Sequence, residues 1–245
     1  MLLVDNFFTN LLGLMRCQRV IANQMFGPLI LGTPSSQPPP MKTISPLSTP
    51  APLRMRDVFE LERGTEILSD DPYIATYSHL LAFFEPKSSF NASDVVCGAH
   101  MVYGWMPTIL ELYPDADRCD LAAAAAMLTK AKLGHRLDAW ELEALAGLMN
   151  NSVVGVSKLL HFVAPQNYAI WDSKVFAFVR GERPHHYRVN SVHFYQSYLE
   201  ELRNLVERPG FEQFHASMNK KIGYAVSPLR ALELVMFLNA PIYRA

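Results

Sequence analysis

The sequence predicts a mainly α-helical protein, built as a two-lobed bundle with a cleft between the lobes. From about residue 55 onward, apolar residues recur at the three- and four-residue spacing of helices. Helix-capping residues precede many of these segments, and no segment sustains the alternation of a β-strand. Half of the 245 residues are apolar, which is enough for a stable core. We expect one helical domain over residues 54–245, with lobes at about 54–150 and 151–245.

The first 53 residues differ from the rest. Apolar positions in residues 1–32 follow helical spacing, and we expect an amphipathic segment that docks on the body, on a membrane surface or on a partner. Their continuous apolar stretches are far shorter than the roughly 20 residues that a membrane span needs, so no span is predicted. Residues 33–53 are rich in Pro, Ser and Thr, which predicts an extended linker.

Capping and helix-breaking residues give the bounds of the expected helices. The expected helices are 72–85 after Asp70-Asp71; one from Ser93 or Asp94 to Trp105; Leu121 to Leu133, capped by Asp120 and closed by Gly134; one from the Asp138-x-x-Glu141 capping box to Met149; one from Asn190 or Ser191 to Val206; and Leu229 to Leu238 after Ser227-Pro228.

The candidate site begins at Gly155, which permits a tight turn, and Ser157 is expected to cap the helix that this turn opens. Lys158 then lies near a helix N-terminus. The helix dipole disfavours a cation there by roughly 0.3–1 kcal/mol, so a lysine at this end is costly unless something uses it. The alternative is an ordinary lysine on the solvated surface.

Asp172 follows Lys158 by 14 positions and opens a second helix that ends at Gly181. If the two helices pack antiparallel, the two side chains come within reach of each other. Aspartate is also a common helix N-cap, worth typically about 1 kcal/mol, and a capping carboxylate can face a cleft at the same time.

The surrounding segment, residues 152–193, is locally basic. Its net charge is +3, whereas that of the whole chain is -1. Basic residues interleaved with aromatic ones suit a phosphate backbone and stacked bases, and the alternative is a chance cluster on a solvated loop. The charged residues of this segment are Lys158, Lys174, Arg180, Arg183 and Arg188, against Asp172 and Glu182.

The pattern Gly155-x-x-Lys158, an apolar helix, Pro165 and then Ile170-Trp171-Asp172-x-x-Val175 resembles the core of the helix–hairpin–helix DNA glycosylases. The resemblance covers about 25 residues and implies a helix–hairpin–helix-like element at 153–180. Members of this family are all-α, two-lobed enzymes whose hairpin grips a DNA phosphate through backbone amides. The resemblance implies that Asp172 is the catalytic aspartate and that Lys158 is the lysine of members that also nick DNA.

The chemistry implied by this resemblance is coherent. Cleavage of an N-glycosidic bond builds positive charge on the sugar, which a carboxylate beside C1′ stabilises. A lysine with a lowered pKa can attack C1′ and form a Schiff base. The base must first leave the stack and enter a pocket, for which Tyr103 and Trp105 are the first candidates and His161 and Trp171 the second. Their alternative role is core packing.

DNA is therefore the expected partner, and no cofactor or metal is expected. The expected DNA contacts are Gly155, Ser157, Lys174, Arg183 and Arg188, and Arg230 is a further candidate for a phosphate contact. A cluster of His185, His186 and His193 lacks the spacing and the carboxylates of a metal site. Three distant cysteines without a C-x-x-C pair fit a reducing cytoplasm.

Two functions remain open from the sequence. One is a DNA glycosylase that removes a damaged or hypermodified base, in repair or in defence against phage DNA. The other is a non-catalytic helical module that binds DNA or a protein. Lys158 and Asp172 in one cleft, with Tyr103 or Trp105 opposite, would favour the enzyme; a Lys158 that points to bulk water would favour the module.

Overall fold

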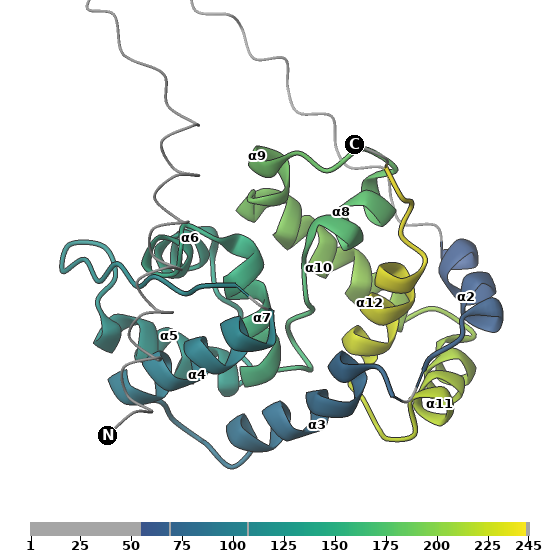
Figure 1. The fold of residues 1–245 in the computed structure, drawn as a ribbon, viewed down its shortest axis with the longest axis horizontal. Coiled ribbons are helices and arrows are strands. Elements are labelled where there is room, and N and C mark those ends of the chain that lie inside the picture. Colours follow the sequence, from purple (N-terminus) through teal and green to yellow (C-terminus); the bar gives the residue numbers. More distant parts are fainter. Residues whose placement is uncertain (1–54, 69, 107, 244–245) are drawn as a thin grey trace, which may run out of the picture. The chain divides into compact units, whose positions relative to one another are not determined.

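The structure is a computed structural model that describes residues 55–68, 70–106 and 108–243 (Figure 1). These residues form eleven α-helices and no β-strand, which confirms the mainly α prediction. The predicted N-terminal segment 1–32 and the linker 33–53 lie outside the described residues. None of the described helices is both long enough and apolar enough to cross a membrane.

The helices follow one another with short connections. They are α2 (Met55–Gly64), α3 (Pro72–Phe84), α4 (Ala92–Trp105), α5 (Leu121–Lys132), α6 (Ala139–Leu148), α7 (Val153–Val163), α8 (Ser173–Arg180), α9 (His186–Val189), α10 (Val192–Val206), α11 (Phe211–Ile222) and α12 (Pro228–Leu238).

Several of these helices begin directly after the N-cap residues that the sequence predicted. Asp120, Asp138, Asp172 and Ser227 each accept an N–H hydrogen bond from the first turn of the helix that follows. The start of α4 was predicted two or three residues late, because Asn91 is its cap and Asp94 closes the capping box from the third helical position.

α11 was not predicted individually. It lies between Gly210 and Gly223, whose φ angles of 91° and 89° only glycine adopts readily. Its buried residues recur at helical spacing and are Phe211, Phe214, Met218 and Ile222.

The predicted turn at Gly155 was wrong, and so was the predicted cap at Ser157. α7 begins at Val153, and its cap is Ser152, which accepts the Gly155 N–H. The chain turns earlier, at Asn150 and Asn151, whose φ angles are 55° and 49°. Asparagine tolerates this left-handed region better than most residues, so no glycine is needed there.

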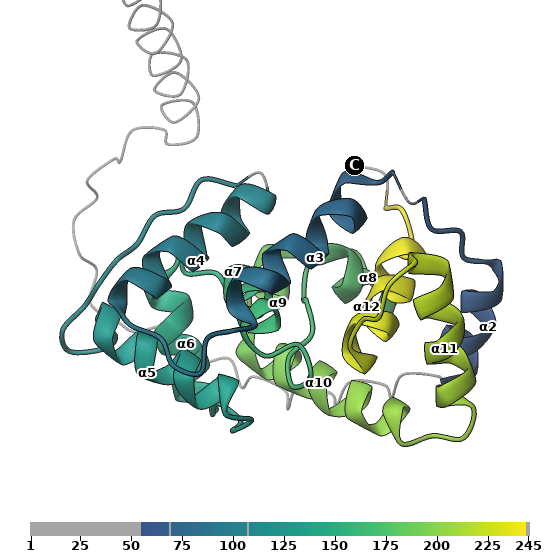
Figure 2. The same ribbon diagram turned by 90° about the horizontal axis from the view of Figure 1, so that it is seen from below.

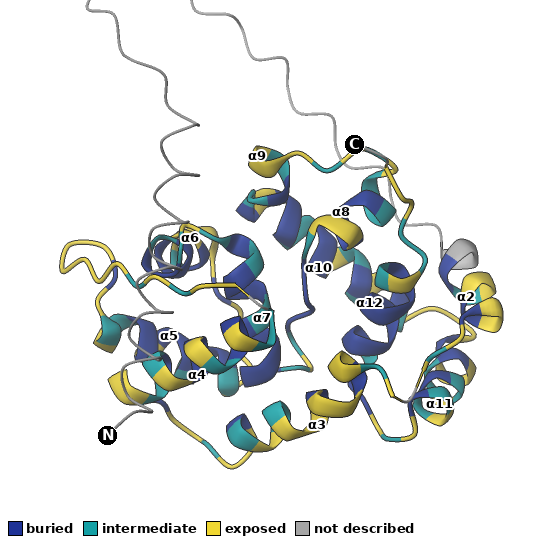
Figure 3. Ribbon diagram, in the orientation of Figure 1, coloured by how far each residue is buried: buried dark blue, intermediate teal, exposed yellow. Residues whose placement is uncertain are grey.

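The helices pack around α7 and α12. α7 packs against α3, α4, α5 and α6, whereas α12 packs against α2, α8, α10 and α11. α10 also contacts α6 and so lies beside both sets of helices (Figure 2). The two central helices are the most buried (Figure 3): α12 is buried throughout Leu229–Met236, and in α7 only Val154 and Lys158 are not buried.

Candidate active site

A cavity of about 460 Å³ lies among α3, α4, α7, α8 and α12. This volume falls within the range of small-molecule and cofactor sites. Most of the wall is apolar or aromatic, as such sites usually are, and a few charged side chains converge on it. The charged residues of the wall are Glu66, Asp71, Lys158, Asp172, Lys174, Arg230 and Glu233.

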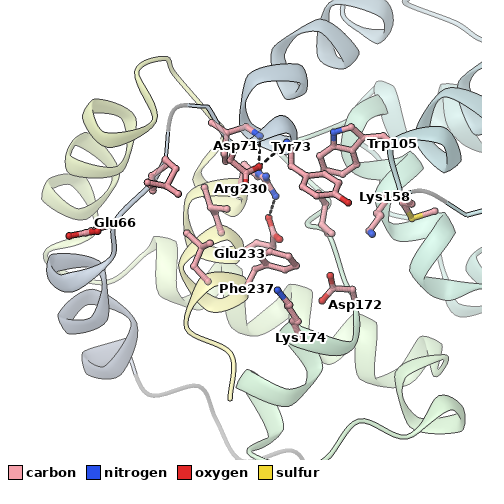
Figure 4. Close-up of a pocket in the computed structure, with 17 residues that line it drawn as sticks. Glu66, Asp71, Tyr73, Trp105, Lys158, Asp172, Lys174, Arg230, Glu233 and Phe237 are labelled. Atoms are coloured by element: carbon pink, nitrogen blue, oxygen red, sulfur yellow. Dashed lines mark hydrogen bonds and ion pairs between the residues drawn. The ribbon is translucent and has the colours of Figure 1, made fainter. Parts of the chain in front are cut away.

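Lys158 and Asp172 share this cavity. Figure 4 shows the Lys158 ammonium and the Asp172 carboxylate pointing into the same space. Within the described part of the chain, no side chain forms a hydrogen bond or an ion pair with the Lys158 ammonium. Lys158 is thus a half-buried cation whose free end faces a cavity instead of bulk water.

Burial lowers the pKa of Lys158, and the negative charges of Asp172 and Glu233 oppose this shift. Lys158 was predicted to lie near the start of its helix, but the structure places it further along the helix. It is in the second turn of α7, where the effect of the helix dipole has largely faded. Desolvation, and not the dipole, is therefore what favours the neutral amine.

Asp172 caps α8 and reaches the cavity at the same time. Its Oδ1 accepts the Val175 N–H at 2.9 Å, and its backbone is extended. This hydrogen bond fixes the carboxylate, and the side chain also lines the cavity. Asp172 is therefore a helix cap, as predicted, and it also borders the cavity.

Ser157 ties the residue before Lys158 to the residue before Asp172. Its Oγ accepts the Trp171 N–H at 3.0 Å and lies 2.8 Å from the Val154 carbonyl and 3.1 Å from the Trp171 carbonyl, either of which can accept its hydrogen. The expected contact of Ser157 with DNA does not fit this position, because the side chain is fully buried. It instead sets the spacing of the two charged groups.

The loop that carries Asp172 is held by side chains from other elements. Each carbonyl from residue 167 to 170 accepts a hydrogen bond, which satisfies a buried irregular backbone. The donors are Arg203 to Asn167 (3.2 Å), His161 to Tyr168 (2.8 Å), Tyr195 to Ala169 (3.2 Å) and Tyr198 to Ile170 (3.3 Å).

Three of the four predicted base-pocket residues belong to the core instead. Tyr103 is buried against Gly155, and its hydroxyl donates to the Met149 carbonyl at 3.3 Å. Trp171 is fully buried, and its indole N–H donates to the Val189 carbonyl at 2.8 Å. His161 is fully buried as well. None of the three lines the cavity.

His161 is a neutral structural residue. Its Nδ1 lies 2.8 Å from the Tyr168 carbonyl, which can only accept, so Nδ1 carries the hydrogen. Its Nε2 therefore accepts the Tyr77 hydroxyl at 2.7 Å. Burial lowers the pKa of His161 to about 3, and the charge of Arg230 adds to this effect.

Trp105, the fourth predicted base-pocket residue, lines the cavity, together with two aromatic residues that were not predicted. Its ring meets that of Tyr73 edge-on at 5.3 Å, and its indole N–H donates to Thr76. Phe237 of α12 also lines the cavity, and the Lys174 ammonium lies 4.2 Å from the centre of its ring. Such rings can stack on a base.

Only two of the five residues predicted to contact DNA are exposed on the surface. Gly155 is buried, like Ser157. Arg188 forms an ion pair with Glu182 and lies over the ring of Phe194. Lys174 and Arg183 are the exposed cations of the segment 152–193.

Glu233 was missed at the sequence level. It is 1% exposed, lines the cavity and pairs with Arg230. Arg230 is buried as well and lies 4.7 Å from the centre of the Tyr77 ring. Arg230 is thus no surface phosphate contact. Burial raises the pKa of Glu233 to about 7, and Arg230 opposes this rise. The sequence feature that could have identified Glu233 is the presence of two charged residues in the otherwise apolar Leu229–Leu238 segment.

Among the described residues, no three His, Cys, Asp or Glu side chains gather closely enough to hold a metal ion. Comparisons with protein-family models, with curated proteins and with solved structures gave no match.

Proposed function

We propose that this protein is a DNA glycosylase that removes a damaged or hypermodified base, with Lys158 as the nucleophile and Asp172 as the charge-stabilising carboxylate. One observation carries the proposal: a partly desolvated lysine and a carboxylate, on different elements, open into one cavity with Trp105 in its wall. A surface-binding module has no need of such an enclosed amine.

The reaction begins with the neutral Lys158 amine, whose share increases as its pKa falls. The nitrogen bonds to C1′, the N-glycosidic bond breaks, and its electron pair leaves with the base, which takes up a proton. Positive charge develops on the sugar, and the fixed Asp172 carboxylate stabilises it. The nitrogen then passes a proton to the ring oxygen, the bond from C1′ to that oxygen breaks, and the nitrogen lone pair forms the C=N bond of the protonated Schiff base.

The two sets of packed helices correspond, in this proposal, to the two lobes of the enzyme. α4 and α7 contribute Trp105 and Lys158 from one set, and α8 and α12 contribute Lys174 and Glu233 from the other. The cavity is then the cleft. In this proposal α3 to α7 form one lobe, and α2 joins α8, α10, α11 and α12 in the other.

The DNA-gripping hairpin, in the same proposal, is α6, the turn at Asn150-Asn151 and α7. The Val153 N–H is taken by Asn190 and that of Gly155 by Ser152, which leaves the Val154 N–H for a phosphate. The exposed Arg183 adds positive charge for the DNA backbone.

The test is base release from DNA that carries candidate bases such as uracil, 8-oxoguanine or 5-hydroxymethylcytosine, scored as abasic sites. Asp172→Asn keeps the cap, because asparagine caps as well as aspartate, but it removes the charge. We expect base release to fall by at least ~100-fold with the unfolding free energy nearly unchanged.

Asp172→Ala is the matched control, because it removes the cap as well and costs about 1 kcal/mol of stability. If Asp172→Asn releases the base as fast as the wild type, Asp172 is only a cap and the mechanism is wrong.

A further inference from the structure

The Glu233 carboxyl is a buried group with one oxygen unused. Arg230 binds Oε2, whereas Oε1 has no hydrogen-bond partner among the residues that the structure describes. Because Glu233 lines the cavity, this oxygen is open to a ligand there. Figure 4 places Glu233 and Lys158 on opposite sides of the cavity, with Asp172 below them.

Groups from several helices act on this carboxyl. Burial and the negative charge of Asp172 favour its neutral form, whereas Arg230 and Lys158 favour the carboxylate. The phenols of Tyr77 on α3 and Tyr198 on α10 also interact with it electrostatically. The balance is a pKa of about 7, so both forms are present near neutral pH, as a general acid requires.

We propose that Glu233 is the proton donor of this site: it protonates the hydroxyl group that leaves as water when the Lys158 amine condenses with the aldehyde of an abasic sugar. This inference rests on the proposed function. It assigns Glu233 a role different from that of Asp172, whose carboxylate accepts the Val175 N–H.

The step balances without any further reactant. The neutral amine adds to the C1′ aldehyde and gives a carbinolamine. The Glu233 acid passes its proton to the carbinolamine hydroxyl, the C–O bond breaks, and water leaves. The nitrogen lone pair forms the C=N bond of the protonated Schiff base, and Glu233 remains as a carboxylate.

The test uses the full chain and a DNA duplex with one abasic site, made by removing a uracil, in the presence of sodium cyanoborohydride. This reagent reduces the Schiff base to a stable adduct. The adduct rate is measured from about pH 5 to about pH 9. The same reaction with free lysine corrects for the pH dependence of the reagent.

For the wild type we expect a profile that levels off near about pH 7. The reaction needs the neutral Lys158 amine and the protonated Glu233 acid, so the rate does not rise further once the pH exceeds the Glu233 pKa of about 7. Glu233→Gln removes this limit and slows the reaction at about pH 6 by at least ~10-fold, and Glu233→Asp restores part of the rate. Glu212→Gln, an exposed acid on α11, leaves the profile unchanged.

The outcomes separate the two proposals. A wild type that gives no adduct at any pH overturns the proposed function. A wild type that gives an adduct, with Glu233→Gln showing the same pH profile, overturns the role of Glu233 alone. If Glu233→Gln does not fold by circular dichroism, the wild-type profile decides, because a rate that keeps rising above about pH 7 is enough to reject the proposal.

Discussion

Gly155 and Tyr103 meet so closely that only a hydrogen fits between them. A Cβ on residue 155 would lie 2.0 Å from the Tyr103 hydroxyl oxygen and 2.6 Å from the ring carbon that bears it. Tyr103 cannot move aside easily, because it is fully enclosed and bonded to the Met149 carbonyl. The glycine thus lets α4 approach α7 one turn before Lys158.

Gly155→Ala should therefore destabilise the protein by about 1–3 kcal/mol or more, through overpacking. Gly104→Ala is the matched control, because a Cβ there meets nothing within 4 Å in the same helix as Tyr103. We expect it to be neutral or to add up to about 1 kcal/mol. Thermal or urea unfolding measures both. Equal stability of the two variants would mean that the contact between Gly155 and Tyr103 is not tight.

Some of the individual residues of the site could be predicted from the sequence, and others could not. Asp172 could be predicted because a helix cap is a local signal, and its helix does begin at the next residue. The role of Gly155 could not, because the ring that it accommodates is 52 positions away. Glu233 could not be predicted for the same reason. Lys158 and Asp172, which act on its carboxyl, come close to it only through tertiary packing.

Among the elements, the loop of residues 164–172 shows how an irregular segment can be rigid. Its carbonyls are bonded to side chains of α7 and α10, and its aromatic side chains are buried. His161 is central to this arrangement, because it links Tyr77 of α3 to the loop. The loop therefore presents Asp172 from a fixed position.

The burial of neutral His161 makes the stability of the fold depend on pH. Its pKa is about 3 in the folded protein and 6.5 in its ordinary state, so the unfolded chain binds the proton first. Stability is then lost as the pH falls from about 6.5 toward 3, by up to about 1.4 kcal/mol per pH unit. Glu233 acts in the opposite direction, because its raised folded pKa adds stability as the pH falls below about 7.

His161→Gln isolates this effect. A glutamine can donate to the Tyr168 carbonyl and accept from the Tyr77 hydroxyl, but it does not titrate. We expect the wild type to lose stability relative to this variant as the pH falls, with the contribution of Glu233 cancelling in the difference. Urea unfolding at several pH values measures it. A constant difference between the two proteins would show that His161 does not titrate as described.

For the whole molecule, the cavity is the product of packing between distant parts of the chain. Its wall combines residues 66–106 with residues 158–238. Helical periodicity predicted the helices, because each buries one face, but periodicity contains no information on which faces meet. The α fold was therefore predictable from the sequence, and the enclosure of Lys158 was not.

Lys158 is the proposed nucleophile of this cavity, and trapping on abasic DNA tests this role most directly. Borohydride reduction at about neutral pH, followed by digestion and mass spectrometry, identifies the modified residue. Lys174 lines the same cavity and serves as an internal control, with Lys174→Arg beside Lys158→Arg. We predict an adduct on Lys158 that Lys158→Arg abolishes and Lys174→Arg retains. An adduct on Lys174, or no adduct with the folded wild type, would show that Lys158 is not the nucleophile.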